Sequence, residues 1–415
     1  MATLLISENF PPRTGGSSRW FWEIYRRLPR ANVVIAAGND PHQSEFDRTH
    51  DLRVVRLPLT FSDWGVFNPR TLRWYWSVFQ SLAAVVRSQG IDQIHCGRTL
   101  PEGWIAWMLK QRYGIPYICY AHGEEINTGY VGQPSGILTS RQLRWMLRRV
   151  MRGGDFVVAN SQSTRQILMN GWGLPASAVR LMHPGVDTQR FVPSARNEAE
   201  RARLGWNDRP VLLTVGRLET RKGHDQMILA LHAIRRTIPD VLYAIVGDGE
   251  RQEFLQSLVE RENLTEHVQF LGELTDERLL HCYQQCDLFV LPNRQVGNDI
   301  EGFGIVLLEA QACGKPVVAG TSGGTAETMR APETGRAISC DTPDEMAAVI
   351  IELLTNSALR SRMGEAARRW VVERFDWSML SDKAEILFQQ SRVGDEVGDR
   401  KHNSTLTAMQ TRRLR

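Results

Sequence analysis

The chain has 415 residues, of which 42% are hydrophobic and 23% charged, with a formal net charge of +4. This composition is typical of a globular protein, and the length exceeds what one ordinary core accommodates, so we expect two domains. The longest charge-free apolar stretch, residues 74–86, is too short to cross a bilayer, and residues 1–6 resemble a strand rather than a secretion signal. We therefore expect a protein that is neither exported nor membrane-spanning.

The charge is distributed unevenly along the chain. Residues 1–190 carry 22 Lys and Arg against 13 Asp and Glu, whereas residues 191–415 carry 28 against 33. A basic first half suits an anionic surface or substrate, although a solvated arginine-rich surface explains it equally well. The six cysteines are scattered and form no CxxC pair, which predicts buried reduced thiols rather than disulfides or zinc.

Short apolar runs alternate with helix-length amphipathic segments along the chain. The predicted strands are residues 3–6, 33–36, 92–95, 117–121 and 156–159 in the first half, and 211–215, 242–246, 268–271, 288–291 and 316–319 in the second. The clearest predicted helices are residues 16–28, 69–88 and 141–151. Such alternation predicts an α/β protein whose parallel sheets are covered on both faces.

The alternation breaks at residues 191–210, which lack a sustained apolar period and are interpreted as an interdomain linker. We therefore predict a domain at residues 1–190, a second at 191–376 and a further helix at 377–390. Residues 391–415, rich in Gly, Asp, Asn, Ser and Arg, are predicted to be a disordered tail.

The most informative segment runs from Glu301 to Gly320, where a loop with two glycines opens a helix that a strand follows. Bare helix N-terminal amides favour an anion, and glycines let a diphosphate approach the backbone. If helical, Glu301 and Glu309 would lie about 12 Å apart along the axis and about 80° around it, which suits two carboxylates holding hydroxyls at the two ends of an elongated ligand. Two solvated glutamates on a surface helix remain the alternative.

Candidate site residues follow three further predicted strands. Arg217 and Lys222 come after residues 211–215, and ligands of open parallel sheets bind beyond the carboxyl ends of strands, so both cations could neutralise a diphosphate. Gly15-Gly16 follows the first strand, and His122-Gly123 follows residues 117–121. A plain turn and a structural histidine are the alternatives at these two places. Neither a dinucleotide-binding GxGxxG nor a P-loop pattern is present.

Taken together and in order, these segments resemble family 4 of the retaining glycosyltransferases, which have the GT-B fold of two Rossmann-like domains facing a cleft. Further matching motifs are His183-Pro-Gly-Val-Asp187, Val246-Gly-Asp-Gly249, Phe270-Leu-Gly272 and Ser322-Gly-Gly-Thr-Ala-Glu327. The resemblance covers residues 4 to about 387. The stretch from Gly297 to Val306 looks most like bacterial mannosyltransferases that act on phosphatidylinositol mannosides and like cell-surface polysaccharide enzymes.

The resemblance implies a role for each matching residue. Glu301 would face the transferred sugar beside the backbone of Gly302, Phe303 and Gly304, while Ile305 would lie by the diphosphate and Glu309 would hold the ribose. Arg217 and Lys222 match the family's diphosphate cations. Gly16 and His122 match the first domain's edge of the cleft, residues 271–274 with Leu271 would flank the base, and the helix opened by Trp377 would brace the first domain. Ser17-Ser18-Arg19 departs from the family pattern, so the acceptor stays open.

The implied function is transfer of a hexosyl unit from GDP-mannose or a UDP-hexose to a lipid-linked or saccharide acceptor in bacterial envelope or polysaccharide synthesis. We expect no metal and no cofactor, because protein cations and a helix N-terminus would stabilise the leaving diphosphate, and no nucleic-acid partner. A nucleotide-sugar epimerase on the same fold and a non-catalytic nucleotide-sugar-binding partner are the alternatives. The sequence leaves the donor base, the sugar, the linkage and the oligomeric state open.

Residues 141–152 are basic and apolar at once, which suggests contact with an anionic membrane surface. At helical spacing Leu143, Met146, Leu147 and Val150 share one face, and arginines 141, 144, 148 and 152 form a neighbouring row beside Trp145. The alternative is a surface helix whose apolar face packs on its own domain. Residues 69–88 offer a second aromatic patch. We accordingly expect a cytoplasmic protein, peripheral at the inner face of the plasma membrane.

Overall fold

The computed structural model describes residues 2–123, 126–127 and 140–389. The chain divides into two compact units that interleave in sequence. Of the described residues, unit 1 comprises 2–120, 145–158 and 378–389, and unit 2 comprises 121–123, 126–127, 140–144 and 159–377. The predicted domain bounds divide the chain differently and remain a prediction, and the predicted tail at residues 391–415 lies outside the described residues.

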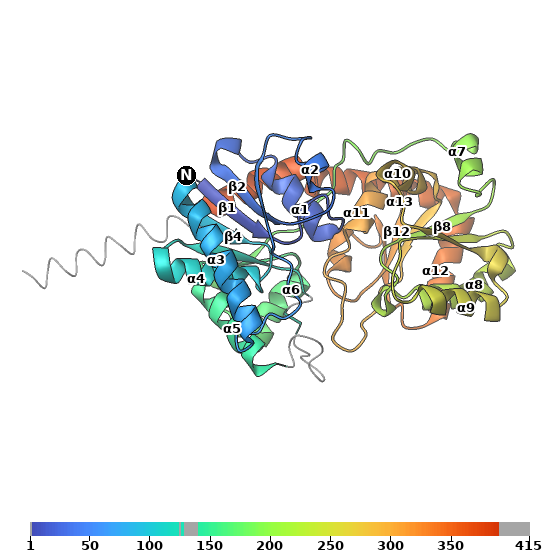
Figure 1. Ribbon diagram of the computed structural model, residues 1–415. Coiled ribbons are helices and arrows are strands. Elements are labelled where there is room, and N and C mark those ends of the chain that lie inside the picture. The colour runs from blue at the N-terminus through green and yellow to red at the C-terminus, as the bar shows by residue number, and fades with distance from the viewer. Residues whose placement is uncertain (1, 124–125, 128–139, 390–415) are drawn as a thin grey trace, which may run out of the picture. The chain divides into compact units, whose positions relative to one another are not determined.

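The first sheet has seven strands in the order β3-β2-β1-β4-β5-β6-β7. Figure 1 labels β1, β2 and β4 of this sheet. The strands are β1 (Ala2–Ser7), β2 (Val33–Gly38), β3 (Arg53–Leu57), β4 (Ile91–Cys96), β5 (Tyr117–Ala121), β6 (Val157–Ala159) and β7 (Val179–Leu181). The pairs β1–β2, β1–β4, β2–β3 and β4–β5 are parallel. The order places β1 beside β4, so the chain reverses its direction of winding there and both strands end at the same edge.

The second sheet has six strands in the order β10-β9-β8-β11-β12-β13, and its pairs are parallel. The strands are β8 (Val211–Val215), β9 (Leu242–Val246), β10 (Val268–Gly272), β11 (Leu288–Leu291), β12 (Val317–Gly320) and β13 (Gly335–Ile338). Its winding reverses between β8 and β11, which is where open α/β sheets bind ligands.

Helices cover both faces of the second sheet. Alternate residues of a strand point to opposite faces, and Val211 and Leu213 belong to a core with residues of α10 and α11, whereas Leu212 belongs to a core with residues of α8, α9 and α12. Every residue of β8 is buried. The continuous apolar strands of this chain therefore reflect a sheet that meets water on neither face.

The helices that frame the two sheets follow the predicted alternation. They are α1 (Gly16–Tyr25), α2 (Gln43–Phe46), α3 (Pro69–Gln89), α4 (Glu102–Tyr113), α5 (Arg141–Gly153), α6 (Gln162–Gln166), α7 (Glu198–Arg203), α8 (His224–Thr237), α9 (Gln252–Arg261), α10 (Asp276–Gln285), α11 (Ile305–Ala312), α12 (Pro343–Thr355) and α13 (Ser357–Arg374). Residues 377–389 are also helical. Phe388, on this last helix, packs its ring 4.3 Å from that of His95 within unit 1.

All ten predicted strands are present, and β3, β7 and β13 are the strands that the sequence did not predict. Each of the three is at the edge of its sheet. Edge strands are short and partly solvated, so they need no continuous apolar run. In β3, an exposed arginine begins the strand and the other residues are only half-buried.

The interpretation of residues 191–210 as a linker is wrong for most of that segment. It contains α7, and Phe191, Leu204 and Trp206 are buried in the core of the second sheet. Arg201 is 1% exposed and donates through its side chain to the carbonyls of Asn207, Gln285 and Arg209. A buried arginine that satisfies backbone carbonyls leaves no apolar periodicity in the sequence, which is why the segment resembled a linker.

Candidate donor site in unit 2

The loop after β8 presents two buried cations. β8 ends at Val215, and the chain then forms a short 3-10 helix, η5 (Thr220–Lys222), before α8 begins at His224. Arg221 is 5% exposed and Lys222 is 8% exposed. Both lie on the carboxyl side of a central strand, which is the edge where parallel sheets bind ligands.

Glu301 is the carboxylate that these cations contact. Its Oε2 lies 2.6 Å from Lys222 Nζ and 2.5 Å from a terminal nitrogen of Arg221. Burial by itself raises the pKa of Glu301, but the charges of Lys222 and Arg221 outweigh burial and lower the pKa. The carboxylate is therefore held ionised inside the protein, ready to accept hydrogen bonds from hydroxyl groups.

The backbone around Glu301 is tightly packed. Gly324 N donates to Glu301 O at 3.0 Å. Gly323 has a φ of +78°, and a Cβ there would lie 1.9 Å from the same carbonyl oxygen. A Cβ on Gly302 would lie 2.6 Å from His122 O. These close approaches explain two of the glycines in the predicted motifs, because a side chain at either position would displace the Glu301 backbone.

The helix α11 begins at Ile305 with Gly304 as its N-cap, and no side chain caps it. Its first amides therefore have no side-chain acceptor, which is the arrangement that favours an anion. Phe303 is 3% exposed, and its ring lies 5.2 Å from that of His183. Glu301 precedes the helix, so the helical separation predicted for Glu301 and Glu309 is wrong: the chain is not helical between Glu301 and Gly304.

Glu309 lies inside α11 and is 5% exposed. Its Oε2 accepts a hydrogen bond of 2.7 Å from the Tyr283 hydroxyl. It is therefore not the solvated surface glutamate of the alternative interpretation. Leu271, in β10, is half-buried and packs against the core on the α11 side of the sheet.

The other predicted residues are placed differently. Arg217 has a side chain that is 64% exposed and pairs with Glu219 at 2.9 Å, so the structure does not bring it to Glu301 as it brings Lys222. His122 is half-buried, and its carbonyl accepts from Asn160 Nδ2 at 3.1 Å beside Gly302. Gly16, the first residue of α1, belongs to unit 1.

Arg221 is a buried cation at this site that the sequence did not indicate. It pairs with Glu219 at 2.8 Å and with Asp299 at 3.3 Å, in addition to Glu301. The Arg-Lys dipeptide was visible, but a charged pair on a loop is common on protein surfaces. Only the burial of Arg221 distinguishes it, and burial depends on the packing of Asp299 and Glu301 from a distant part of the chain.

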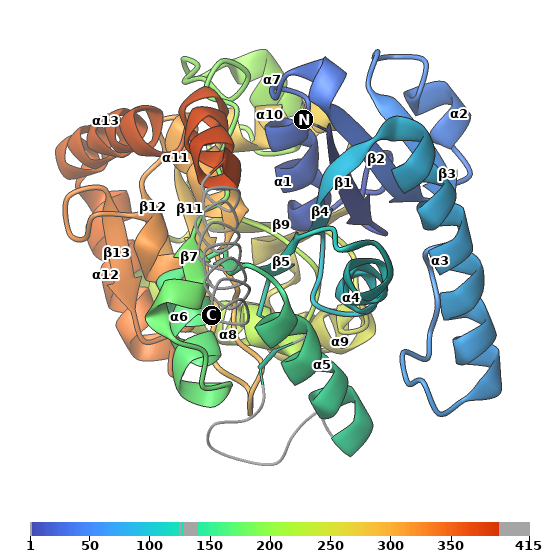
Figure 2. The same ribbon diagram turned by 90° about the vertical axis from the view of Figure 1, so that its left-hand side faces the viewer.

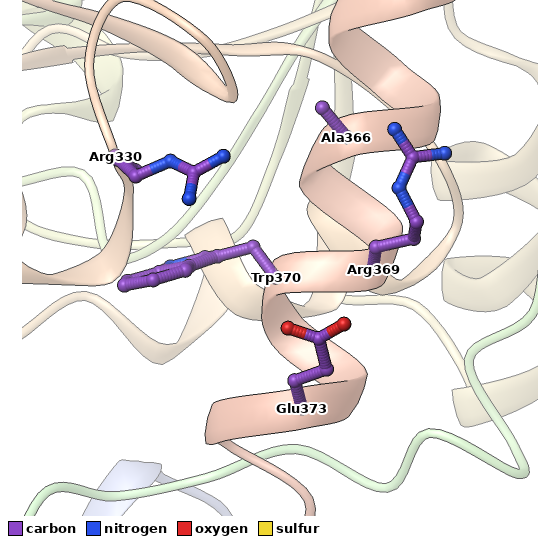
Figure 3. A pocket seen from close by; sticks show the side chains of 5 residues that line it. All are labelled: Arg330, Ala366, Arg369, Trp370 and Glu373. Carbon is purple, nitrogen blue, oxygen red and sulfur yellow. The ribbon is translucent and has the colours of Figure 1, made fainter.

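A separate hollow of about 250 Å³ lies on α13 and contains none of the predicted site residues (Figure 3). Its lining is Arg330, Ala366, Arg369, Trp370 and Glu373. Arg330 lies 5.7 Å from the Trp370 ring centroid and pairs with Glu333. Over the described ranges there is no group of three or more His, Cys, Asp or Glu residues arranged to hold a metal ion.

Comparisons with known proteins identify glycosyltransferases as relatives of this chain. The family model "Glycosyltransferase Family 4" matches residues 14–190, and "Glycosyl transferases group 1" matches residues 196–370. A GDP-mannose-dependent alpha-(1-6)-phosphatidylinositol monomannoside mannosyltransferase of Mycolicibacterium smegmatis is 32% identical over 90% of this chain and 94% of its own. A GDP-mannose-dependent monoacylated alpha-(1-6)-phosphatidylinositol monomannoside mannosyltransferase of Corynebacterium glutamicum is 32% identical over 93% of this chain and 97% of its own.

Solved structures with a similar fold include Anabaena HepE in complex with UDP, with a TM-score of 0.75 at 20% identity over 94% of this chain and 100% of HepE. Sucrose-phosphate synthase from Thermosynechococcus elongatus gives a TM-score of 0.78 at 23% identity over 95% and 100%. The two parallel α/β sheets and these neighbours define the GT-B class of proteins. With relatives 32% identical over nearly their whole length, the chain belongs to glycosyltransferase family 4.

Proposed function

We propose that this glycosyltransferase moves a hexosyl unit from a nucleotide-diphosphate sugar to a lipid-linked or saccharide acceptor, with retention of configuration and without a metal. The observation that supports it best is the buried Glu301 carboxylate held by Lys222 and Arg221 before the N-terminus of α11. This arrangement pairs an acceptor for sugar hydroxyls with groups that attract an anion. GDP-mannose is the first donor to test because the relatives are named as GDP-mannose-dependent, and a UDP-hexose is the second.

In the proposed reaction the acceptor hydroxyl oxygen forms a bond to the anomeric carbon on the face from which the diphosphate departs. The bond from that carbon to the diphosphate oxygen breaks, its electron pair stays on the diphosphate, and the acceptor's proton passes to a diphosphate oxygen. Lys222, Arg217 and the first amides of α11 stabilise the developing charge. Glu301 accepts hydrogen bonds from hydroxyls of the transferred sugar, Glu309 from the ribose, and Leu271 flanks the base.

A panel of nucleotide sugars tests this proposal. The purified protein is incubated with GDP-mannose, UDP-glucose and related donors, with and without a lipid-linked saccharide, and nucleoside diphosphate release is measured together with the product's anomeric configuration. We expect the release of nucleoside diphosphate to depend on the acceptor. With GDP-mannose, whose anomeric bond is axial, we expect the product's anomeric bond to be axial as well. A product of inverted configuration contradicts retention, and interconversion of the donor's own sugar without transfer favours an epimerase.

We further propose that the protein works in the cytoplasm, as a peripheral protein at the inner face of the plasma membrane of a bacterium, in envelope or polysaccharide synthesis. No helix in the described part of the chain is both long and apolar enough to span a membrane. In unit 1, α4 lies between α3 and α5 (Figure 2). The ring of Phe79 in α3 lies beside that of Tyr113 in α4, and the ring of Trp145 in α5 lies beside that of Trp104 in α4.

The apolar face of α5 is not available for a membrane. Met146, Leu147, Val150 and Met151 are buried, as the alternative interpretation of this helix required. The remaining candidates are the exposed arginines 148, 149 and 152 with Trp145, which is 48% exposed, and the exposed apolar side chains Phe67, Leu72 and Trp76 near the start of α3. Arginines next to aromatic rings suit the headgroup region of an anionic bilayer.

Co-sedimentation with vesicles tests membrane docking. We expect binding to phosphatidylglycerol vesicles that weakens with salt, with each basic residue contributing up to about 1 kcal/mol, and a marked loss in Arg148/Arg149/Arg152→Glu, which changes the three exposed arginines of α5 in unit 1. Arg203/Arg236/Arg261→Glu is the matched control, because it makes the same charge change at exposed positions of unit 2. Equal binding by both triple variants, or binding that ignores lipid charge, contradicts the proposed docking surface.

A further inference from the structure

Arg221 is held in place by several carboxylates. It is 5% exposed, and among the described residues its guanidinium contacts the carboxylates of Glu219, Asp299 and Glu301 at 2.8, 3.3 and 2.5 Å. Its own carbonyl accepts from Arg294 N at 2.8 Å. A planar guanidinium fixed by several partners at once has little freedom to turn toward a ligand.

Lys222 differs from Arg221 in this respect. Within the described ranges, Lys222 forms an ion pair with Glu301 alone. Its Nζ contacts Oε2, the same oxygen that Arg221 contacts. A lysine is a point charge on a flexible four-carbon stem and can redirect its three N–H donors. A diphosphate bearing several negative oxygens next to Lys222 competes with Glu301 for that ammonium.

If the ammonium turned to the diphosphate and Arg221 were absent, Glu301 would become a buried carboxylate that has lost both of these cations. Such a charge is strongly destabilised, and it responds by taking up a proton or by moving toward water. Either response would remove the acceptor that faces the sugar hydroxyls. Arg221 prevents this only if it stays in place, which its contacts with Glu219 and Asp299 favour.

We propose, on the basis of the function proposed above, that Arg221 is a positioning residue that keeps the Glu301 carboxylate ionised and oriented toward the donor sugar while Lys222 contacts the diphosphate. Asp299 is part of the segment that leads to Glu301, and the Val296 and Asp299 backbones bond to each other at 3.1 and 3.0 Å. Arg221 thereby also connects the loop after β8 to the conformation of that segment.

The test compares Arg221→Gln, Arg221→Lys and the control Arg294→Gln in the full chain. Arg294 pairs bidentately with Asp225 at 2.9 and 2.7 Å, has a side chain 15% exposed and lies on the same segment without an ion pair to Glu301. Calorimetry with UDP, GDP and the corresponding nucleotide sugars gives binding, and steady-state kinetics gives kcat and KM. Thermal denaturation shows which variants are folded at the assay temperature.

We expect Arg221→Gln to bind the nucleoside diphosphate within about twofold of wild type but to lower kcat about 10- to 160-fold, as expected for loss of a charged hydrogen bond. The difference in affinity between the nucleotide sugar and the nucleoside diphosphate should become smaller. Arg221→Lys should restore part of the lost kcat and part of this affinity difference. Arg294→Gln should retain the wild-type kcat even if its thermal stability falls as much as that of Arg221→Gln.

The pH profile separates positioning from a structural role. The pKa of Glu301 is lowered against the effect of burial by Lys222 and Arg221, with Glu219 and Asp299 surrounding Arg221. Removing the Arg221 charge should move the acid limb of kcat to higher pH, whereas Arg294→Gln should leave it unchanged. Equal kcat and equal acid limbs in Arg221→Gln and Arg294→Gln overturn the proposal. Failure of the wild-type protein to bind or transfer from any donor overturns instead the proposed function on which it rests.

Discussion

Replacing Lys222 with methionine tests the donor site most directly. Methionine retains an unbranched apolar stem but removes the ammonium. Glu301 keeps Arg221 as a partner at 2.5 Å, so the variant loses one of the two cations seen at this carboxylate rather than both. The fold should therefore survive, and the main effect should fall on the ligand that Lys222 is proposed to hold.

The size of the effect follows from the contact that is lost. A hydrogen bond to a charged group contributes about 1.5–3 kcal/mol, and each 1.36 kcal/mol corresponds to a factor of ten, so nucleoside diphosphate affinity should fall about 10- to 160-fold. Because Lys222 is 8% exposed, bulk water screens this contact less than it screens a surface pair. The loss should consequently persist at moderate salt concentration.

Isothermal titration calorimetry with GDP and UDP measures this change, and circular dichroism establishes that the variant is folded. Lys110→Met is the matched control, because Lys110 pairs with Asp155 at 3.4 Å in unit 1, outside the proposed donor site. Unchanged affinity in a folded Lys222→Met protein, or an equal loss in Lys110→Met, would refute the assignment of Lys222 to the diphosphate.

Three further predictions concern the metal, the ribose and acid stability. Sugar transfer should continue in excess EDTA; activity that disappears and returns with magnesium or manganese would overturn the metal-free mechanism. Glu309→Ala should weaken nucleoside diphosphate binding by about 1.5–3 kcal/mol. Tyr283→Phe should weaken it less, because it removes only the hydroxyl that donates to Glu309. Equal affinities in both variants and the wild type would exclude a ribose contact. Burial lowers the pKa of His224 from 6.5 to about 4, so the unfolded chain binds more protons between these values and stability falls as pH drops from 6.5 toward 4, by up to about 1.4 kcal/mol per pH unit. Chemical denaturation at several pH values should show a shallower acid slope for His224→Asn than for wild type, and identical slopes would disprove this contribution.

The sequence alone was sufficient for the strands that carry the core. The strand β8 coincides with the run at residues 211–215, and β9 with the run at 242–246. Strands in the middle of a parallel sheet are buried on both faces, so their burial appears in the sequence as an unbroken apolar run. The edge strand β13, Gly335–Ile338, contains an arginine and a glycine in four residues and gave no such signal.

The family motifs predicted site roles for Glu301, Glu309 and Lys222 from local features, namely carboxylates and cations next to glycine-rich turns, and these roles remain predictions. The structure shows that all three residues are buried. The motifs did not indicate where α11 begins relative to Glu301. Continuing the helix backward to Glu301 was wrong because Gly304, with a φ of +86°, is the N-cap and the chain turns there.

Only the tertiary structure brought Arg221 to Glu301, 80 residues further along the chain. An arginine's sequence neighbours do not say whether it is solvated, as Arg217 largely is, or buried among carboxylates, as Arg221 is. Local propensity and apolar periodicity determine strands and helices, whereas the pairing of buried charges depends on which loops meet at the carboxyl edge of the sheet. That meeting is a consequence of strand order, with β8 placed beside β11, and strand order is a property of the packed fold.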